Sequence, residues 1–263
     1  MIKALLLALT LASPALAETQ DEVLSATLLP GWQMENGHHM AGVSLSLAPE
    51  WKTYWRSPGD AGIPPLFDWS GSQNVKSLRV LWPSPQVFHT NGLQTIGYHD
   101  AVTLPVEVTP LDPSKPVHLS ARVDLGICKD ICMPAEVALK GDLTTPGAPD
   151  RAIRAALNAL PVAGKAAGLK HIACRMTPIK DGVQVVAELT LARQGPEETV
   201  VFEAKDPQIW VSEASSSRAG NVLTARADFV SGSGAPFALQ RSGVRVTVLS
   251  AAGSVEIAGC PAP

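Results

Sequence analysis

The stretch "VHLSARVDLGICKDICMPAEVALKG", residues 117–141, decides the fold of the first half of this chain. Apolar and polar residues alternate through 117–127, which is the period of a β-strand with one buried face. After a short break, every second residue from 133 to 139 is again apolar. A helix with Pro134 in its first turn is the alternative for this second part. The alternation on both sides of the break favours strand–turn–strand.

Two cysteines, Cys128 and Cys132, flank the break. Residues i and i+4 of a straight strand lie about 13 Å apart, beyond disulfide reach, so the chain must turn at 129–131. A bridge across so short a loop stabilises the fold by only about 2 kcal/mol through its restraint of the unfolded chain. Stability alone is therefore a weak reason for this bridge. At an exposed hairpin tip beside the cation Lys129, the pair is open to thiolate attack. The residues alone leave redox exchange, a structural bridge and metal binding as hypotheses.

Residues 1–17 have the pattern of a secretory signal peptide, with Lys3, an apolar run over 4–11 and the small-x-small ending Ala15-Leu16-Ala17. We expect this segment to be removed and the mature protein to be exported to an oxidising compartment. No later run approaches the roughly 18 to 20 apolar residues of a transmembrane helix, so direct membrane insertion is not expected.

Charge and composition narrow the class of protein. The net charge is −3 without a basic cluster, which argues against nucleic acid and anionic membrane surfaces as partners. The 21 glycines and 22 prolines separate many short runs rich in Val, Leu and Thr. This pattern is typical of β-sandwiches, and we expect an all-β fold.

A Pro/Gly-rich stretch, "TTPGAPD" at 144–150, divides the chain. Five of the six tryptophans precede it, and Asp150 is suited to cap a short helix that follows. We expect a signal peptide at 1–17, an immunoglobulin-like β-sandwich at 18–143, a linker with a short helix at 144–167 and a second β-sandwich at 168–263.

Cys174 and Cys260 lie near the start and end of the second half. In an oxidising compartment we expect them to form a structural disulfide across the first and last strands. A bridge around about 85 residues stabilises the fold by about 4 to 5 kcal/mol in the chain-entropy model. A second redox pair is the alternative.

Three motifs of the first half occur in order: "WKTYWRSPGDAGIPP" (51–65), "IGYHDAVTLPVEV" (96–108) and "DLGICKDICMPAE" (124–136). Together they resemble the N-terminal periplasmic domain of the thiol:disulfide interchange protein DsbD, most closely its variant in alphaproteobacteria and copper-tolerance relatives. The resemblance covers about residues 28–142. It implies an immunoglobulin-like sandwich in the periplasm, and the Pro/Gly-rich part of the first motif is expected to shape a loop beside the site.

The resemblance implies that Cys128 and Cys132 are the exchanging pair. By the order in the family, Cys132 forms the mixed disulfide with an acceptor and Cys128 resolves it. The family shields its pair with a cap loop that bears an aromatic residue. The corresponding stretch here is 84–94, with Phe88 as the expected cap and Leu93 as the second choice.

Tyr54 and Tyr98 are expected to line the site, as tyrosines do in the family, with ordinary sandwich packing as the alternative. The chain departs from the family in two respects. Its cysteines are closer together, and its cap stretch lacks the acidic residues that could manage protons there. His89 could take that role, against the simpler interpretation of a solvated loop histidine.

The resemblance implies a thiol–disulfide oxidoreductase without a cofactor. A membrane-embedded thiol reductase would donate electrons, and oxidised periplasmic thioredoxin-like proteins would accept them. Family members fuse the domain to a membrane electron carrier and a terminal thioredoxin-like domain. These 263 residues contain neither, so we expect a separate donor. Such a relay could serve cytochrome c biogenesis, disulfide correction or copper tolerance.

A metal alternative rests on "MENGHHM" at 34–40, which gathers two histidines and two methionines, donors that suit copper. Asn36-Gly37 also reads as a hairpin turn, and the histidines would then only lead into the next strand. A further hypothesis is an adaptor in which both disulfides are structural. The alternative to the relay is a copper-binding or chaperone module that uses Cys128, Cys132, His38 and His39.

Overall fold

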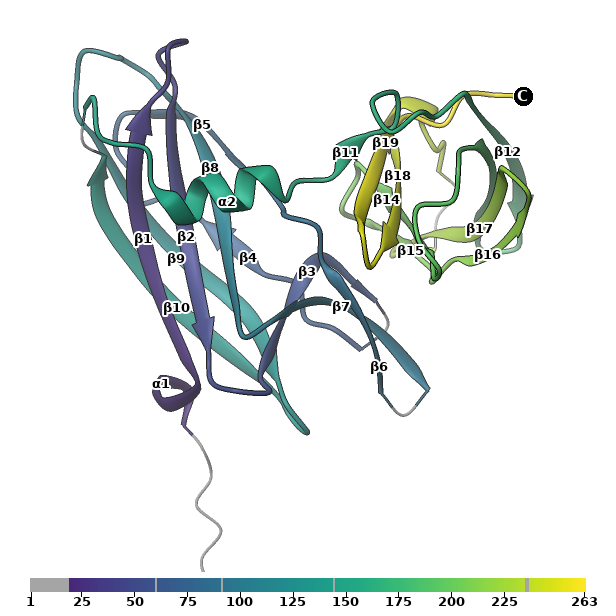
Figure 1. Ribbon diagram of the computed structural model, residues 1–263, viewed down its shortest axis with the longest axis horizontal. Helices are drawn as coiled ribbons and strands as arrows, with labels where there is room; N and C mark the ends of the chain where they lie inside the picture. Colours follow the sequence, from purple (N-terminus) through teal and green to yellow (C-terminus); the bar gives the residue numbers. More distant parts are fainter. Residues whose placement is uncertain (1–18, 60, 91, 144, 235–236) are drawn as a thin grey trace, which may run out of the picture.

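The computed structural model describes residues 19–263 except 60, 91, 144 and 235–236. The expected signal peptide, residues 1–17, lies outside the described residues. Strands dominate the described chain and pack as two β-sandwiches (Figure 1), which confirms the predicted all-β class. Within this part of the chain, no helix has the length and apolar character needed to cross a membrane.

The first sandwich consists of two sheets that follow the short helix α1 (Gln20–Val23). One sheet has the order β1-β2-β8-β5, and the other has the order β10-β9-β3-β7-β6, with β4 beside β9. The bounds are β1 (Leu24–Gln33), β2 (His39–Leu47), β3 (Lys52–Gly59), β4 (Leu66–Asp68), β5 (Val75–Val80), β6 (Gln86–Thr90), β7 (Leu93–His99), β8 (Ala101–Pro110), β9 (Val117–Cys128) and β10 (Cys132–Leu143).

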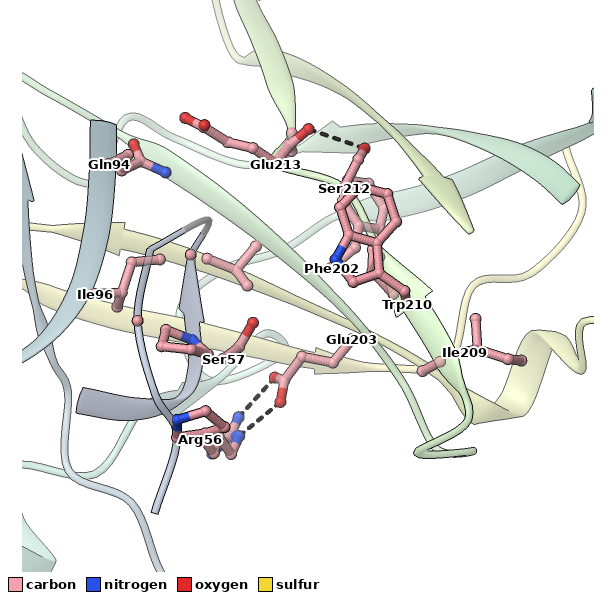
Figure 2. Close-up of a pocket in the computed structure, with 18 of the residues that line it drawn as sticks. Arg56, Ser57, Gln94, Ile96, Phe202, Glu203, Ile209, Trp210, Ser212 and Glu213 are labelled. Atoms are coloured by element: carbon pink, nitrogen blue, oxygen red, sulfur yellow. Dashed lines mark hydrogen bonds and ion pairs between the residues drawn. The ribbon is translucent and has the colours of Figure 1, made fainter. Parts of the chain in front are cut away.

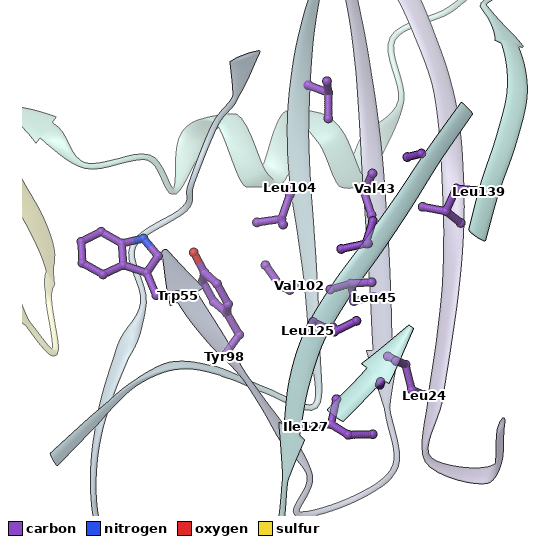
Figure 3. Close-up of a cluster of buried hydrophobic side chains, with 14 of the residues drawn as sticks. Leu24, Val43, Leu45, Trp55, Tyr98, Val102, Leu104, Leu125, Ile127 and Leu139 are labelled. Atoms are coloured by element: carbon purple, nitrogen blue, oxygen red, sulfur yellow. The ribbon is translucent and has the colours of Figure 1, made fainter. Parts of the chain in front are cut away.

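The core of this sandwich lies between its sheets, because alternate residues of each strand point inward. Val43 and Leu45 of β2, Leu104 of β8 and Leu125 of β9 are buried together (Figure 3). Full burial of such a side chain contributes about 1.5 to 3 kcal/mol. The outer face of β9 is thereby left for other roles.

The strands β9 and β10 form one unbroken antiparallel hairpin. Their register runs from Val117 opposite Leu143 to Cys128 opposite Cys132. This confirms the strand–turn–strand prediction, and the helical alternative is wrong. Pro134 is tolerated because β10 is an edge strand of its sheet, where a missing N–H need not break a ladder.

The segment between the sandwiches contains α2 (Arg151–Asn158). The Asp150 carboxylate accepts hydrogen bonds from the N–H groups of Ala152 and Ile153, which confirms the predicted N-cap. Ile153 is buried against Gly42 of β2, where a Cβ atom would come within 2.9 Å of it. The helix is therefore packed on the first sandwich rather than extended as a free linker.

The second sandwich also has two sheets, with the orders β11-β19-β18-β14 and β12-β13-β17-β15, and β16 beside β17. A separate apolar cluster fills its interior, around Phe202 and Phe229. The bounds are β11 (Val162–Ala163), β12 (His171–Ile179), β13 (Gly182–Thr190), β14 (Thr199–Ala204), β15 (Ile209–Val211), β16 (Ser215–Ala219), β17 (Val222–Ser231), η1 (Arg241–Gly243), β18 (Val244–Ser250) and β19 (Gly253–Ala258).

Arg56 of β3 joins the two sandwiches. Its guanidinium donates to both carboxylate oxygens of Glu203, at 2.8 and 2.9 Å, and to Glu256 at 2.6 Å. Burial opposes the charge of this side chain, but the hydrogen bonds and negative charge of Glu203 and Glu256 raise the pKa of Arg56. The cation is therefore held in place by two anions of the other sandwich.

Further contacts join the two sandwiches. The Ser84 and Ser254 hydroxyls lie 2.6 Å apart, and the Ser84 N–H donates to the Ala159 carbonyl. Val201 and Leu249 of the second sandwich belong to the buried cluster of the first. The two sandwiches thus meet through an ion pair, hydrogen bonds and apolar contacts.

We predict that Arg56→Ala loosens the two sandwiches and lowers the free energy of unfolding by about 1 to 3 kcal/mol, since two partly buried carboxylates lose their shared cation. Small-angle scattering should show a broader particle, and thermal unfolding should split into two transitions. Arg245→Ala is the matched control, because Arg245 lies 3.7 and 3.6 Å from the same carboxylates but belongs to the second sandwich. Unchanged scattering and a single transition in Arg56→Ala would contradict the prediction.

We predict that the double substitution Cys174→Ala/Cys260→Ala lowers the free energy of unfolding by about 4 to 5 kcal/mol, because this disulfide has a sequence separation of 86. The double substitution Cys128→Ala/Cys132→Ala, with a separation of 4, should lower it by about 2 kcal/mol or less. Chemical denaturation of both variants measures the difference. Equal losses would show that the Cys174–Cys260 disulfide stabilises the fold no more than the Cys128–Cys132 disulfide does.

Candidate functional site

The cysteine pair lies at the tip of the β9–β10 hairpin, where Cys128 and Cys132 are opposite each other and joined as a disulfide with a Cα–Cα distance of 4.1 Å. Their exposures differ. Cys128 is only 4% exposed, whereas Cys132 is open to solvent. A thiolate arriving from solution can therefore reach the sulfur of Cys132 more readily than that of Cys128.

Tyr54 of β3 contacts the exposed cysteine, Cys132. Its hydroxyl oxygen lies 3.2 Å from the sulfur of Cys132, and its ring is almost completely buried. A disulfide sulfur carries no proton, so the hydroxyl donates this hydrogen bond. Burial raises the pKa of Tyr54, so the phenol keeps its proton at neutral pH.

The Pro/Gly-rich segment after β3 covers this tyrosine. Gly62 lies against the Tyr54 ring, and the Ile63 carbonyl accepts a hydrogen bond from the Gly126 N–H at 3.4 Å. A Cβ atom on Gly126 would come within 2.6 Å of the Ile63 side chain, so only glycine allows the segment to lie this close. The predicted loop beside the site is confirmed.

Comparison with known proteins agrees with this arrangement. Residues 25–143 match the family model described as thiol:disulfide interchange protein DsbD, N-terminal. These residues form a DsbD N-terminal domain. The domain is thus of the thiol:disulfide interchange type, in a family of periplasmic domains.

A solved structure extends the comparison to the second sandwich. The crystal structure of the N-terminal periplasmic domain of ScsB from Proteus mirabilis matches with a TM-score of 0.68 and 22% sequence identity. The match covers 94% of this chain and 96% of that one, so both sandwiches and their order recur there. No curated protein sequence matches significantly.

The expected cap residue of the DsbD domain, Phe88, lies on β6. The Nζ atom of Lys52 is 5.1 Å from the centre of its ring, and the His99 ring is 6.2 Å away. Lys52 is opposite Cys128 in the register of β3 and β9. Two strands, β3 and β7, therefore lie between Phe88 and the strand of Cys128, and the shielding of the disulfide by Phe88 stays a prediction.

The other expected site residues have different positions. Tyr98 points into the core beside Trp55 (Figure 3), and its hydroxyl donates to the Pro83 carbonyl. Tyr98 thus packs in the sandwich, whereas Tyr54 contacts the sulfur. His89 is exposed on the face of β6 opposite to Phe88. Leu93, the second choice for the cap, begins β7 and is exposed.

The turn between the cysteines carries an ion pair. Lys129 lies 2.8 Å from Glu50, and its hydrogen bond and charge lower the pKa of that carboxyl. The cation that we expected beside the disulfide is therefore held by a carboxylate from the β2–β3 connection. This contact ties the hairpin tip to the neighbouring turn.

The proposed copper set is not brought together, and this hypothesis needs correction. His38 and His39 lie at the start of β2. Cys128 is opposite Lys52, which begins β3 and follows the other end of β2 along the chain. The start of β2 and the tip of the β9–β10 hairpin lie at opposite ends of the sandwich (Figure 1). At the start of β2, His38 contacts Glu107 and His39 contacts the Pro30 carbonyl. Among the described residues, no group of three or more His, Cys, Asp or Glu side chains could hold a metal ion.

The second disulfide is enclosed. Cys174 of β12 bonds to Cys260, which follows β19, and both are buried. Arg241 donates hydrogen bonds to the carbonyl groups of both cysteines. This bridge is closed to an external thiolate in the folded protein, in contrast to the one at the hairpin tip.

Sequence reasoning missed a cleft of about 530 Å³ between the sandwiches. Figure 2 shows Arg56 and its bond to Glu203 on one side of it and Trp210 on the other. Trp210 is 58% exposed, and the segment that covers Tyr54 also lines the cleft. The one available signal was that Trp210 is the only tryptophan after the linker.

We predict that Tyr54→Phe slows alkylation of Cys132 at neutral pH by about tenfold, because the thiolate loses a hydrogen bond worth about 1.4 kcal/mol. The measurement is the iodoacetamide rate in a Cys128→Ser background, where Cys132 is unbridged. Tyr98→Phe is the matched control, since it removes a buried hydroxyl that contacts no sulfur. Equal rates in the two variants would exclude a role for the Tyr54 hydroxyl.

Proposed function

We propose that this protein relays electrons between thiols in the periplasm. It accepts two electrons from a membrane-embedded thiol reductase and passes them to oxidised thioredoxin-like proteins. The observation that carries the proposal is the unequal exposure of a disulfide at a hairpin tip, with Cys132 open and Cys128 buried. A purely structural bridge needs no such difference between its sulfurs.

Electron delivery begins from the reduced pair. The Cys132 thiolate attacks one sulfur of the acceptor disulfide, forms a mixed disulfide and releases the other acceptor sulfur as a thiolate, which takes up a proton. The Cys128 thiol loses its proton and attacks Cys132. That step closes the Cys128–Cys132 bond and frees the acceptor as a dithiol, so two electrons and two protons have moved.

Reloading is the same reaction in the opposite direction. A thiolate of the donor attacks the exposed sulfur of Cys132, and the Cys128 thiolate leaves. The second donor thiol then displaces Cys132 and leaves the donor oxidised. The Tyr54 hydroxyl, 3.2 Å from the Cys132 sulfur, stabilises the negative charge that forms there in both directions.

The remaining parts support this role. In such a relay, residues 1–17 are the signal peptide, 18–143 the redox sandwich, 144–167 the linker and 168–263 a second sandwich that positions partners. The contacts of Phe88 and Lys52 favour a shielding role for Phe88 beside Cys128. Cys174–Cys260 holds the second sandwich closed throughout the cycle.

We predict that Cys128→Ser accumulates a mixed disulfide with an oxidised thioredoxin-like protein, because its Cys132 can attack but nothing can resolve the product. Cys132→Ser, the matched variant, should form at least about tenfold less, because its remaining thiol is buried. Non-reducing electrophoresis and peptide mass mapping identify the adduct and its cysteine.

Two results would contradict the relay. One is equal trapping by both variants. The other is a reduction potential of the Cys128–Cys132 pair below about −300 mV, which is the range of structural disulfides. Graded thiol buffers with alkylation trapping measure both pairs in the same protein. Cys174–Cys260 serves as the internal reference, since it is buried.

A further inference from the structure

Apolar side chains are exposed around the sulfur of Cys132. Ile131, in the turn between the cysteines, is 79% exposed, and Pro134, Ile63 and Leu66 are also exposed. We call these four residues the apolar strip. Turns favour Gly, Asn, Asp and Ser, so an isoleucine at this position serves no need of the turn.

The strand register places the strip on one face. Pro134 is opposite Gly126, against which Ile63 packs, and Leu66 is opposite Asp124. Gly126 and Asp124 alternate with the buried residues of β9, so they lie on its outer face together with Cys128. The strip therefore begins at the reactive tip and continues along the same outer surface.

Farther from the tip, the same face changes character. Asp124 and Glu136 are opposite each other, level with Leu66 at the end of the strip, and the outward positions beyond them include Arg122, Ser120 and Lys140. Apolar exposure is thus concentrated where a partner must come closest. Exposed apolar side chains that gather in an otherwise polar region mark an interaction site.

We infer that the apolar strip is the docking surface for a partner whose reactive cysteine is surrounded by apolar side chains, with Ile131 as the anchor. This rests on the proposed relay. In the mixed disulfide the two sulfurs are about 2 Å apart, so the partner must cover the residues beside Cys132. Apolar contact there favours the mixed disulfide before resolution, and a partner with polar surroundings lacks that contact.

The test uses the reduced full-length protein and two nine-residue peptides, each supplied as its disulfide-linked dimer. One peptide has Leu, Val and Phe around its cysteine, and the other has Ser, Thr and Gln. The protein should react about tenfold faster with the apolar peptide. Ile131→Ser should reduce this preference to about twofold or less and leave the rate with oxidised glutathione unchanged.

Leu111→Ser is the matched control. Leu111 is 68% exposed, in the β8–β9 connection at the opposite end of β9 from Cys128, so its loss should leave the preference intact. Exchange with glutathione but without preference for the apolar peptide would overturn the docking surface and leave the relay standing. No exchange with any of the three disulfides would overturn the relay and the docking surface with it.

Discussion

The unbroken pairing of β9 with β10 is the constraint on which the site depends. A slip of one residue would turn Val123, Leu125 and Ile127 outward and bury Asp124. A slip of two residues would keep the faces but separate the sulfurs. The buried inner face of the hairpin therefore fixes the register, and the register places Cys128 opposite Cys132. Core packing on one side of the sheet thus determines the chemistry on the other.

Features encoded by neighbouring residues were predictable. The alternation around 117–141 indicated the hairpin, Asp150 indicated the start of α2, and "WRSPGDAGIPP" indicated the loop beside the site. The contacts between the two sandwiches could not be predicted from the local pattern, because they join segments far apart in the sequence. Arg56 and Glu203 are 147 residues apart, and no local period relates them.

The copper hypothesis shows why donor type alone is not enough. His38 and His39 are suitable ligands, but the length of β2 separates them from the cysteine tip. Tyr54 and Tyr98 illustrate the same point on a smaller scale. They lie on neighbouring strands of one sheet and face opposite sides, so one contacts a sulfur and the other the core. Which of the two reaches the site follows from strand register, which a resemblance does not provide.

Both disulfides join cysteines that are consecutive along the chain, Cys128 with Cys132 and Cys174 with Cys260. Four cysteines can pair in three ways, and this is the way reached when each cysteine bonds to the next one that follows it. A chain oxidised progressively from its N-terminus therefore arrives at the native connectivity directly. Oxidation in this order requires no reshuffling of wrong bridges, because order of appearance and native pairing coincide.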